Sequence, residues 1–220
     1  MTVHASIRGR SGRSAIGYYS SRAGPLARKF QSISFEEVHS DLLVRLPPSG
    51  SNILDVGAGA GRDAAALARL GFAVTAVEPS NVMRRAAQIA HADARIHWVN
   101  DRLPLLSKLR ARRERFALVL CSAVLMHISP AELEQAVRAL AELVMEDGVV
   151  EVSVRDENES DQRGLFHTHT SDSIIAAGGK AGLAVLSSER CDDALGRSEI
   201  VWRSLRFRRN YSGADRNGAD

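Results

Sequence analysis

The chain has 220 residues and a formal net charge of +3, with 45% hydrophobic and 25% charged residues. This composition is typical of a folded globular domain and excludes the disordered and fibrous classes. A chain of this length buries about 70% of the surface that its unfolded form exposes, so its core needs no disulfide or metal. The two cysteines, Cys121 and Cys191, are far apart in the sequence. They indicate neither a disulfide framework nor a zinc site, and they favour a reducing, cytoplasmic location.

The N-terminal residues do not match a secretory signal, and no apolar stretch is long enough to span a membrane. Residues 1–16 lack the apolar centre of a secretory signal, and we expect them to form a disordered extension, with a second disordered tail at 210–220. The most apolar stretch, 116–126, is about half as long as a membrane-spanning helix. We therefore expect a single domain over residues 17–209, with no membrane partner.

Short β-branched segments alternate with segments of helical periodicity along most of the chain. Strands are predicted at 52–56, 72–77, 95–99, 116–121, 148–155, 183–189 and 200–208. Helices are predicted between them at 61–70, 80–90, 105–112, 129–144 and 172–181. Ser129 and Glu132 form a capping-box pattern with Pro130 at the first helical position. Strands joined by such helices form a parallel sheet that is covered on both faces, so the predicted fold class is α/β, doubly wound.

A glycine-rich turn follows the first predicted strand. Gly57, Gly59 and Gly61 alternate in LDVGAGAGR, which allows a nucleotide-like ligand to approach the backbone near a helix N-terminus. Arg62 stands where the dinucleotide fingerprint requires glycine or alanine, and the third glycine comes one residue early. The sequence therefore does not match a dinucleotide site.

Acidic residues around this turn favour a cationic ligand. Asp55 precedes the turn and Asp63 follows it, and both would repel a pyrophosphate. S-Adenosylmethionine (SAM), which carries an ammonium and a sulfonium group, would be attracted instead. Glu78 ends the second predicted strand, where a carboxylate accepts hydrogen bonds from ribose hydroxyls.

These segments resemble the motifs of class I SAM-dependent methyltransferases over roughly residues 18–155. LDVGAGAGR resembles the first motif, VTAVEPS the second and FALVLCSAVLMH the fourth. The resemblance implies a Rossmann-like sheet of seven strands, mostly parallel with an antiparallel C-terminal strand, and SAM as cofactor with S-adenosylhomocysteine (SAH) as product. The cofactor-binding residues that it implies are Asp55, Gly57, Gly59, Gly61, Glu78, Pro79, Asp101, Arg102, Leu103 and Ser122. Glu146 and Asp147 depart from the family's fifth-strand motif, but only in a turn.

Candidate catalytic and acceptor-binding residues lie outside the glycine-rich turn. His127 follows the fourth strand and is a candidate general base, although a single histidine before a helix is often structural. In the family, an N-terminal segment often closes over the cofactor, so we expect residues 17–46 to form a helical lid. The candidate substrate-binding residues are Tyr18, Tyr19, Arg22, Arg155 and His167, with packing or solvent exposure as the alternatives. His167 and His169 lack a third ligand, so we expect no metal site.

We therefore expect a SAM-dependent methyltransferase that acts on an oxygen or nitrogen atom of a small molecule. The motifs of base-amino and pyrimidine C5 methylases are absent, which disfavours nucleic acid as the acceptor. An RNA or protein methyltransferase, engaged through the arginines at 110–115 and 203–209, remains an alternative, as does a non-catalytic SAM-binding protein. The chain is expected to be a monomer or a homodimer.

Overall fold

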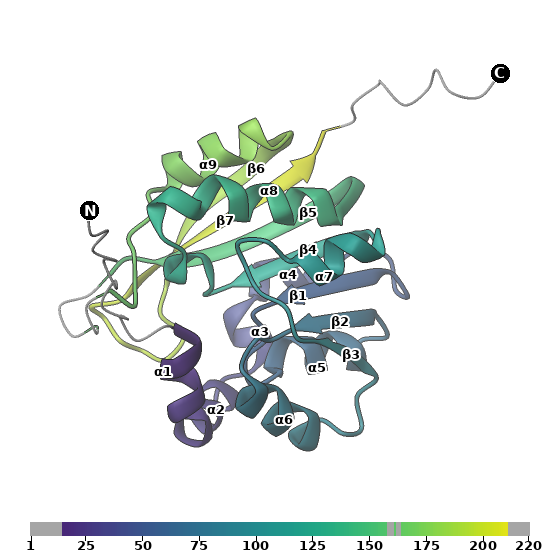
Figure 1. The fold of residues 1–220 in the computed structure, drawn as a ribbon, viewed down its shortest axis with the longest axis vertical. Helices are drawn as coiled ribbons and strands as arrows, with labels where there is room; N and C mark the ends of the chain where they lie inside the picture. Colours follow the sequence, from purple (N-terminus) through teal and green to yellow (C-terminus); the bar gives the residue numbers. More distant parts are fainter. Residues whose placement is uncertain (1–14, 158–160, 162–163, 211–220) are drawn as a thin grey trace, which may run out of the picture.

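A single mixed sheet organises the computed structural model, which describes residues 15–157, 161 and 164–210 (Figure 1). The strands follow the order β3, β2, β1, β4, β5, β7, β6 across the sheet. They are β1 (Asn52–Val56), β2 (Ala73–Val77), β3 (Ile96–Val99), β4 (Phe116–Ser122), β5 (Val144–Arg155), β6 (Leu183–Asp192) and β7 (Val201–Arg209). Neighbours are parallel except on both sides of β7, which pairs antiparallel with β5 and β6. The predicted fold class is confirmed.

Helices connect these strands and precede them. Four short helices come before β1, and five longer or connecting helices follow it in the described part of the chain. They are α1 (Ala15–Ser21), α2 (Ala23–Gln31), α3 (Phe35–Val38), α4 (Ser40–Leu43), α5 (Arg62–Arg69), α6 (Asn81–Ala90), α7 (Ser107–Arg112), α8 (Leu133–Leu143) and α9 (Ser171–Lys180). Among the described residues, no helix combines the length and apolarity needed to span a bilayer.

Two apolar layers flank the sheet. The larger core lies under α7, α8 and α9, which cover one face of the sheet (Figure 1). It includes Leu140, Ile174 and the buried valines of β5. The smaller core lies on the other face, where Phe35 and Leu67 from α3 and α5 pack against β1 and β2. Because α1 and α2 pack against α6 rather than on the sheet, they lie beside the carboxyl ends of the strands, where the ligand site is expected.

The structure moves several predicted boundaries. Helix α1 begins at Ala15, so the predicted extension to residue 16 ends too late; residues 1–14 and the tail at 211–220 lie outside the described residues. Strand β5 begins at Val144 rather than at residue 148, because Val144 pairs with Phe116 before an irregularity in the register.

The predicted capping box before α8 is wrong. The Ser129 hydroxyl donates to the Glu132 carboxylate at 2.6 Å instead of accepting from the backbone, and a 3-10 turn at Pro130–Glu132 separates it from α8. Proline at the first position still starts the turn, since its fixed φ suits a helical conformation.

Candidate functional site

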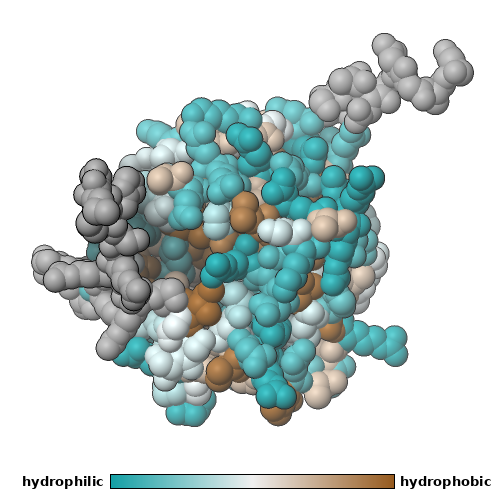
Figure 2. Space-filling model, viewed as in Figure 1, coloured by the Kyte–Doolittle hydropathy of each residue, from teal (hydrophilic) through white to brown (hydrophobic). Residues whose placement is uncertain are grey.

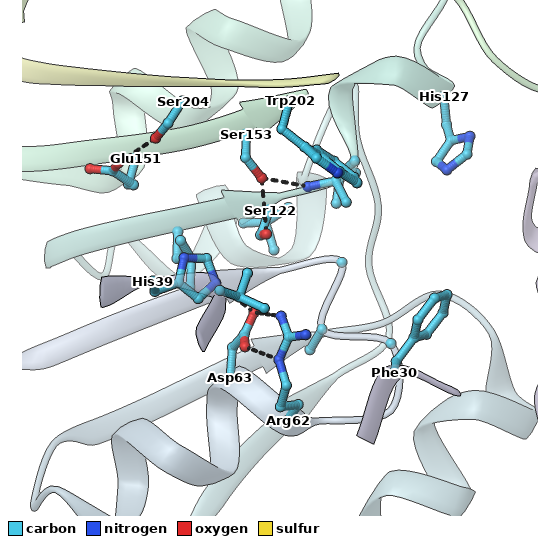
Figure 3. A pocket seen from close by; sticks show the side chains of 18 of the residues that line it. Phe30, His39, Arg62, Asp63, Ser122, His127, Glu151, Ser153, Trp202 and Ser204 are labelled. Atoms are coloured by element: carbon cyan, nitrogen blue, oxygen red, sulfur yellow. Dashed lines mark hydrogen bonds and ion pairs between the residues drawn. The ribbon is translucent and has the colours of Figure 1, made fainter. Parts of the chain in front are cut away.

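A cavity of about 1050 Å³ opens at the carboxyl ends of the central strands and extends across the sheet to β5 and β7 (Figure 3). Its walls come from the glycine-rich turn, the ends of β2 and β4, and the N-terminal helices. The face of the molecule in Figure 2 is mostly hydrophilic, with hydrophobic side chains in small patches near its centre. The volume is slightly above the usual range for small-molecule sites, about 300–1,000 Å³.

The glycine-rich turn forms one wall of this cavity. The N–H groups of Gly57 and Ala58 both donate to the carbonyl of Val77, at 2.8 and 2.9 Å, which fixes the turn against the end of β2. Gly57 has a φ of +77°, and a Cβ there would lie 2.3 Å from a methyl carbon of Val124. Only glycine fits both the backbone conformation and the space.

Glu78 joins the turn to the end of β2. Its carboxylate accepts hydrogen bonds from the N–H groups of Gly59, at 2.9 Å, and Ser80, at 2.7 Å. Burial raises the pKa of Glu78, and these two hydrogen bonds oppose that effect. A carboxylate has about four acceptor positions, so two remain for a ligand in the cavity.

Two residues of the predicted set do not face the cavity. Asp55 is 2% exposed and lies beneath the turn, and burial, followed by the charge of Asp63, raises its pKa well above the ordinary value. One of its carboxylate oxygens has no hydrogen-bond partner among the described residues. A Cβ on Gly61 would meet His91 and Trp98, on the far side of the turn. Neither Asp55 nor Gly61 belongs to the cavity lining that the structure describes, so their direct contact with the cofactor stays a prediction.

The segment after β3 reaches the cavity with Asp101, Arg102 and Leu103, as predicted, and Pro79 and Ser122 also line it. The Asp101 carboxylate, however, is turned toward α7. It accepts hydrogen bonds from the N–H groups of Lys108, at 2.8 Å, and Leu109, at 3.1 Å. These are unpaired donors of the first helical turn, so Asp101 stabilises the start of α7.

His127 lines the cavity with a defined tautomer. Its Nδ1 lies 2.8 Å from the carbonyl oxygen of Leu165, which can only accept, so Nδ1 carries the proton. Nε2 is then the unprotonated atom and accepts a hydrogen bond from the Tyr19 hydroxyl at 3.1 Å. Burial lowers the pKa of His127 below its ordinary value of 6.5 and raises that of Tyr19 to about 12. At neutral pH the imidazole is uncharged and the phenol is protonated.

Most of the predicted substrate-binding residues have other partners. Only Tyr19 belongs to the cavity lining that the structure describes. Tyr18 packs beside it and carries the guanidinium of Arg22 over its ring at 4.4 Å. Arg155 is 7% exposed, pairs through both terminal nitrogens with Asp161 and stacks over Phe166 at 4.2 Å. Arg155 thus already pairs with a carboxylate of the chain, and its role in binding a substrate carboxylate stays a prediction.

His167 contributes to the loop rather than to the cavity. Its backbone N–H donates to the carbonyl of Met126 at 2.7 Å, which ties the loop to the turn that carries His127. His169 is buried, and its Nε2 lies within hydrogen-bond distance of the carbonyls of Leu125 and Ile128. In the described part of the chain, no group of three or more His, Cys, Asp or Glu residues is arranged to hold a metal ion.

Comparison with known proteins identifies the family. The sequence profile of a family described as a methyltransferase domain matches residues 28–192. The chain belongs to this methyltransferase family. The predicted resemblance to class I SAM-dependent methyltransferases, with SAM as cofactor, is confirmed at the level of the family. A search of curated proteins found no matching sequence.

Solved methyltransferase structures share the fold of this domain. A 1,6-didemethyltoxoflavin-N1-methyltransferase from Burkholderia thailandensis superposes with a TM-score of 0.69 at 18% identity, covering 89% of this chain and 87% of that chain. Magnesium protoporphyrin IX methyltransferase from Synechocystis PCC 6803 superposes with a TM-score of 0.61 at 16% identity, covering 92% of this chain and 87% of that chain. The [4+2]-cyclase SpnF superposes with a TM-score of 0.68 at 14% identity, covering 93% of this chain and 100% of that chain. Because SpnF is described as a cyclase, the shared fold does not define the reaction.

The methyltransferase cavity fits an adenosyl cofactor on two observations. A Cβ on Gly59 would have no atom closer than 3.9 Å, so the turn leaves open space on the cavity side, beside Met83. Glu78 keeps free acceptor positions next to that space, at the end of β2. The geometry of the turn depends on Gly57 and Gly59. The ribose and the adenine of SAM would be held by Glu78 and Leu103.

Glu78→Gln is expected to weaken SAM binding by about 1.5–3 kcal/mol, the range for a hydrogen bond to a charged group. The amide cannot accept hydrogen bonds at both of its ends, so it loses one ribose contact and one backbone contact. Calorimetric titration with SAM measures the effect, and a thermal unfolding scan separates it from loss of folding. An unchanged dissociation constant would refute the assignment of Glu78 to the ribose.

Asp101→Ala is expected to act mainly on stability. Loss of the hydrogen bonds to the start of α7 should cost about 1 kcal/mol of unfolding free energy, as for other helix N-terminal caps. The SAM dissociation constant should change by less than about threefold, because the Asp101 carboxylate is engaged by the start of α7. Denaturant unfolding and SAM titration of the same sample test this, and the opposite pattern would restore the predicted adenine contact.

Several cavity residues were not predicted from the sequence. Phe30 comes from α2, His39 from the junction of α3 and α4, and Trp202 from β7 (Figure 3). Arg62 and His39 both bind the buried carboxylate of Asp63. Burial alone would raise the pKa of Asp63, but these two partners lower it below the ordinary value. Phe30 and His39 fall within the expected lid at residues 17–46, but the sequence did not single out either of them as a cavity residue.

Proposed function

We propose that this methyltransferase transfers the methyl group of SAM to an oxygen or nitrogen atom of a small-molecule acceptor. The observation that carries the proposal is the position of His127, whose unprotonated Nε2 lines the same cavity as the glycine-rich turn and Glu78. A base beside the cofactor site is required when the acceptor atom carries a proton. Similar folds in the toxoflavin and protoporphyrin methyltransferases, which are described with small molecules, support the same acceptor class.

The residues of the chain have separate roles in this reaction. When bound, SAM supplies an electrophilic methyl group on a positively charged sulfur. His127 accepts the acceptor proton at Nε2, and the Leu165 carbonyl keeps Nδ1 protonated so that Nε2 stays available. The Tyr19 hydroxyl occupies Nε2 in this structure and must yield that position to the acceptor. Apolar side chains such as Val124 and Leu165 exclude water from the reacting atoms.

The N-terminal helices enclose the cavity, which favours a small acceptor over a macromolecule. Tyr19 and Phe30 lie across from the strand ends, and we propose that residues 17–46 act as the expected lid. The arginines at 110–115 lie outside the cavity lining that the structure describes. Arg110 pairs instead with Glu142 of α8 and Arg112 contacts His97.

Turnover on a panel of metabolites tests the proposal. Purified protein, SAM and each candidate acceptor are incubated together, and SAH formation is measured. We expect SAH production with at least one acceptor, at a rate that changes little with salt. Tight SAM binding without turnover on any compound would support the non-catalytic alternative, and salt-sensitive turnover on RNA would support a polyanion substrate.

A further inference from the structure

One half of the sheet has a polar face where a doubly wound sheet is normally apolar on both faces. On β5 and β7, Glu151 pairs with Arg206 and Ser153 pairs with Ser204, so these four side chains share one face. Neighbouring strands extend this face, because Ser122 aligns with Ser153 and Glu189 with Ser204. On the opposite face the same strands carry buried Val150, Val152, Leu205 and Phe207, under α8 and α9. Such a local break in the expected pattern points to a functional surface.

This polar face lines the cavity rather than open solvent. Ser122, Glu151, Ser153, Ser187, Glu189 and Ser204 all belong to the lining, and we call this part the polar chamber. Ser204 donates to Glu151 at 2.9 Å, and the hydroxyls of Ser122 and Ser153 lie 3.0 Å apart (Figure 3). His39 and Arg45 close the chamber from the side of α3 and α4. The chamber is continuous with the space beside His127.

The charge of the lining is opposite to that of the chain. Ten acidic residues but five arginines line the described part of the cavity, although the whole chain carries a net charge of +3. Two of these arginines are already neutralised in two-point ion pairs, Arg62 with Asp63 and Arg197 with Asp193. Removing both pairs leaves 10 − 2 = 8 acidic residues and 5 − 2 = 3 arginines. The potential in the cavity therefore favours cations and opposes anions.

We propose that the polar chamber binds the methyl acceptor and selects a molecule with a protonated amino group, with Glu151 supplying negative charge in the same cavity. The inference rests on the proposed function, since it names the substrate class of the same site. Glu151 is suited to this role because its side chain is only 12% exposed and Arg206 lies 3.4 Å away, longer than a close ion pair. Aromatic side chains of Tyr19, Phe30 and Trp202 provide faces for the apolar part of such a molecule.

The chemistry balances with His127 as the proton acceptor. A proton leaves the ammonium group for Nε2 of His127, which frees the nitrogen lone pair. The nitrogen then forms a bond to the methyl carbon while the carbon–sulfur bond breaks and its electron pair goes to sulfur. The sulfonium becomes a neutral thioether, the positive charge moves to the methylated amine, and the imidazolium releases its proton to solvent.

Binding of matched probes to the SAH-saturated protein tests the proposal. The probes are 2-phenylethylamine, 2-phenylethanol and 3-phenylpropanoate, which share a ring and chain but differ in charge. We expect the amine to bind about tenfold more tightly than the carboxylate at low salt, with the alcohol between them, and added salt to reduce the difference. Equal or tighter binding of the carboxylate, or preference for the neutral alcohol, would overturn the inference, as would failure of all three probes to bind.

Variants localise the preference. Glu151→Gln keeps an oxygen for Ser204 and should reduce the preference for the amine to about threefold or less. Ser204→Ala leaves the charge of Glu151 in place and should preserve the preference for the amine. This variant keeps the proposal testable if Glu151→Gln fails to fold. The matched control is Glu134→Gln on α8, where Glu134 pairs with Lys180 away from the cavity, and it should bind all three probes as the parent does. An unchanged preference in Glu151→Gln would overturn the role of Glu151.

A separate SAM titration keeps the two hypotheses apart. If the protein fails to bind SAM, the proposed function itself is wrong. If it binds SAM and prefers the carboxylate probe, only the inference about the acceptor is wrong.

Discussion

His127→Asn is expected to bind SAM as tightly as the parent protein and to lose about 10²–10⁴-fold in kcat, the usual contribution of a general base. The asparagine amide can still donate to the Leu165 carbonyl, which His127 Nδ1 reaches at 2.8 Å, so the loop contact is kept. What is lost is the basic Nε2 atom that faces the cavity. Single-turnover rates with an acceptor that must lose a proton measure the effect, alongside SAM titration.

The pH dependence of kcat gives an independent test of the same base. His127 acts only when it is neutral, so activity should fall as the pH drops through the pKa of the folded protein. Burial lowers that pKa below 6.5, and the acid limb is therefore expected below pH 6.5, with a plateau above it. His97→Ala on the distant strand β3 is a control that should keep the limb. A parent-like kcat or an unaltered acid limb in His127→Asn would contradict the assignment.

Gly57→Ala is expected to give the largest loss of cofactor binding of any single methyl addition in the turn. The new Cβ would lie 2.3 Å from Val124 and would force a positive φ on a non-glycine residue. These two effects should cost about 2–4 kcal/mol of unfolding free energy together and displace the turn that holds SAM. Denaturant unfolding and SAM titration report the two losses separately.

Two further variants separate strain from crowding at this position. Gly50→Ala also places a side chain at a positive φ, +84°, but meets no atom within 4 Å. It should cost only about 1–2 kcal/mol and leave SAM binding intact. Adding Val124→Ala to Gly57→Ala should recover part of the lost affinity, because it removes the methyl groups that crowd the new Cβ. No difference between Gly50→Ala and Gly57→Ala would show that crowding is unimportant.

The positions of the strands along the chain and the glycine-rich turn were predictable because their signals are local. Apolar runs such as 52–56, a glycine triplet and a carboxylate at the next strand end lie within about 30 residues of one another. Side-chain direction was not local. The Asp55 carboxylate points under the turn and the Asp101 carboxylate toward α7, because each accepts a hydrogen bond from a backbone N–H group there. Spacing in the sequence does not show whether a carboxylate binds a ligand or the start of a helix.

The rest of the site depends on contacts between distant segments. Tyr19 and His127 are 108 positions apart, and nothing in the sequence around either residue predicts the hydrogen bond between them. Arg155 was predicted to bind substrate because it ends β5, but Asp161 in the following loop neutralises it first. Glu151 and Ser153 fit the alternating pattern of a strand with one solvent-exposed face. The sequence therefore did not show that this face lines a cavity.

Helix α1 makes two contacts that work together. Tyr19 is bonded to His127, and the next residue, Ser20, is bonded to Ser80 at 2.7 Å, two positions after the carboxylate that we assign to the ribose. A seven-residue helix that leaves one of these partners must also leave the other. Release of His127 to an acceptor is therefore expected to loosen the contact beside the ribose site as well, so one short segment couples the two parts of the cavity.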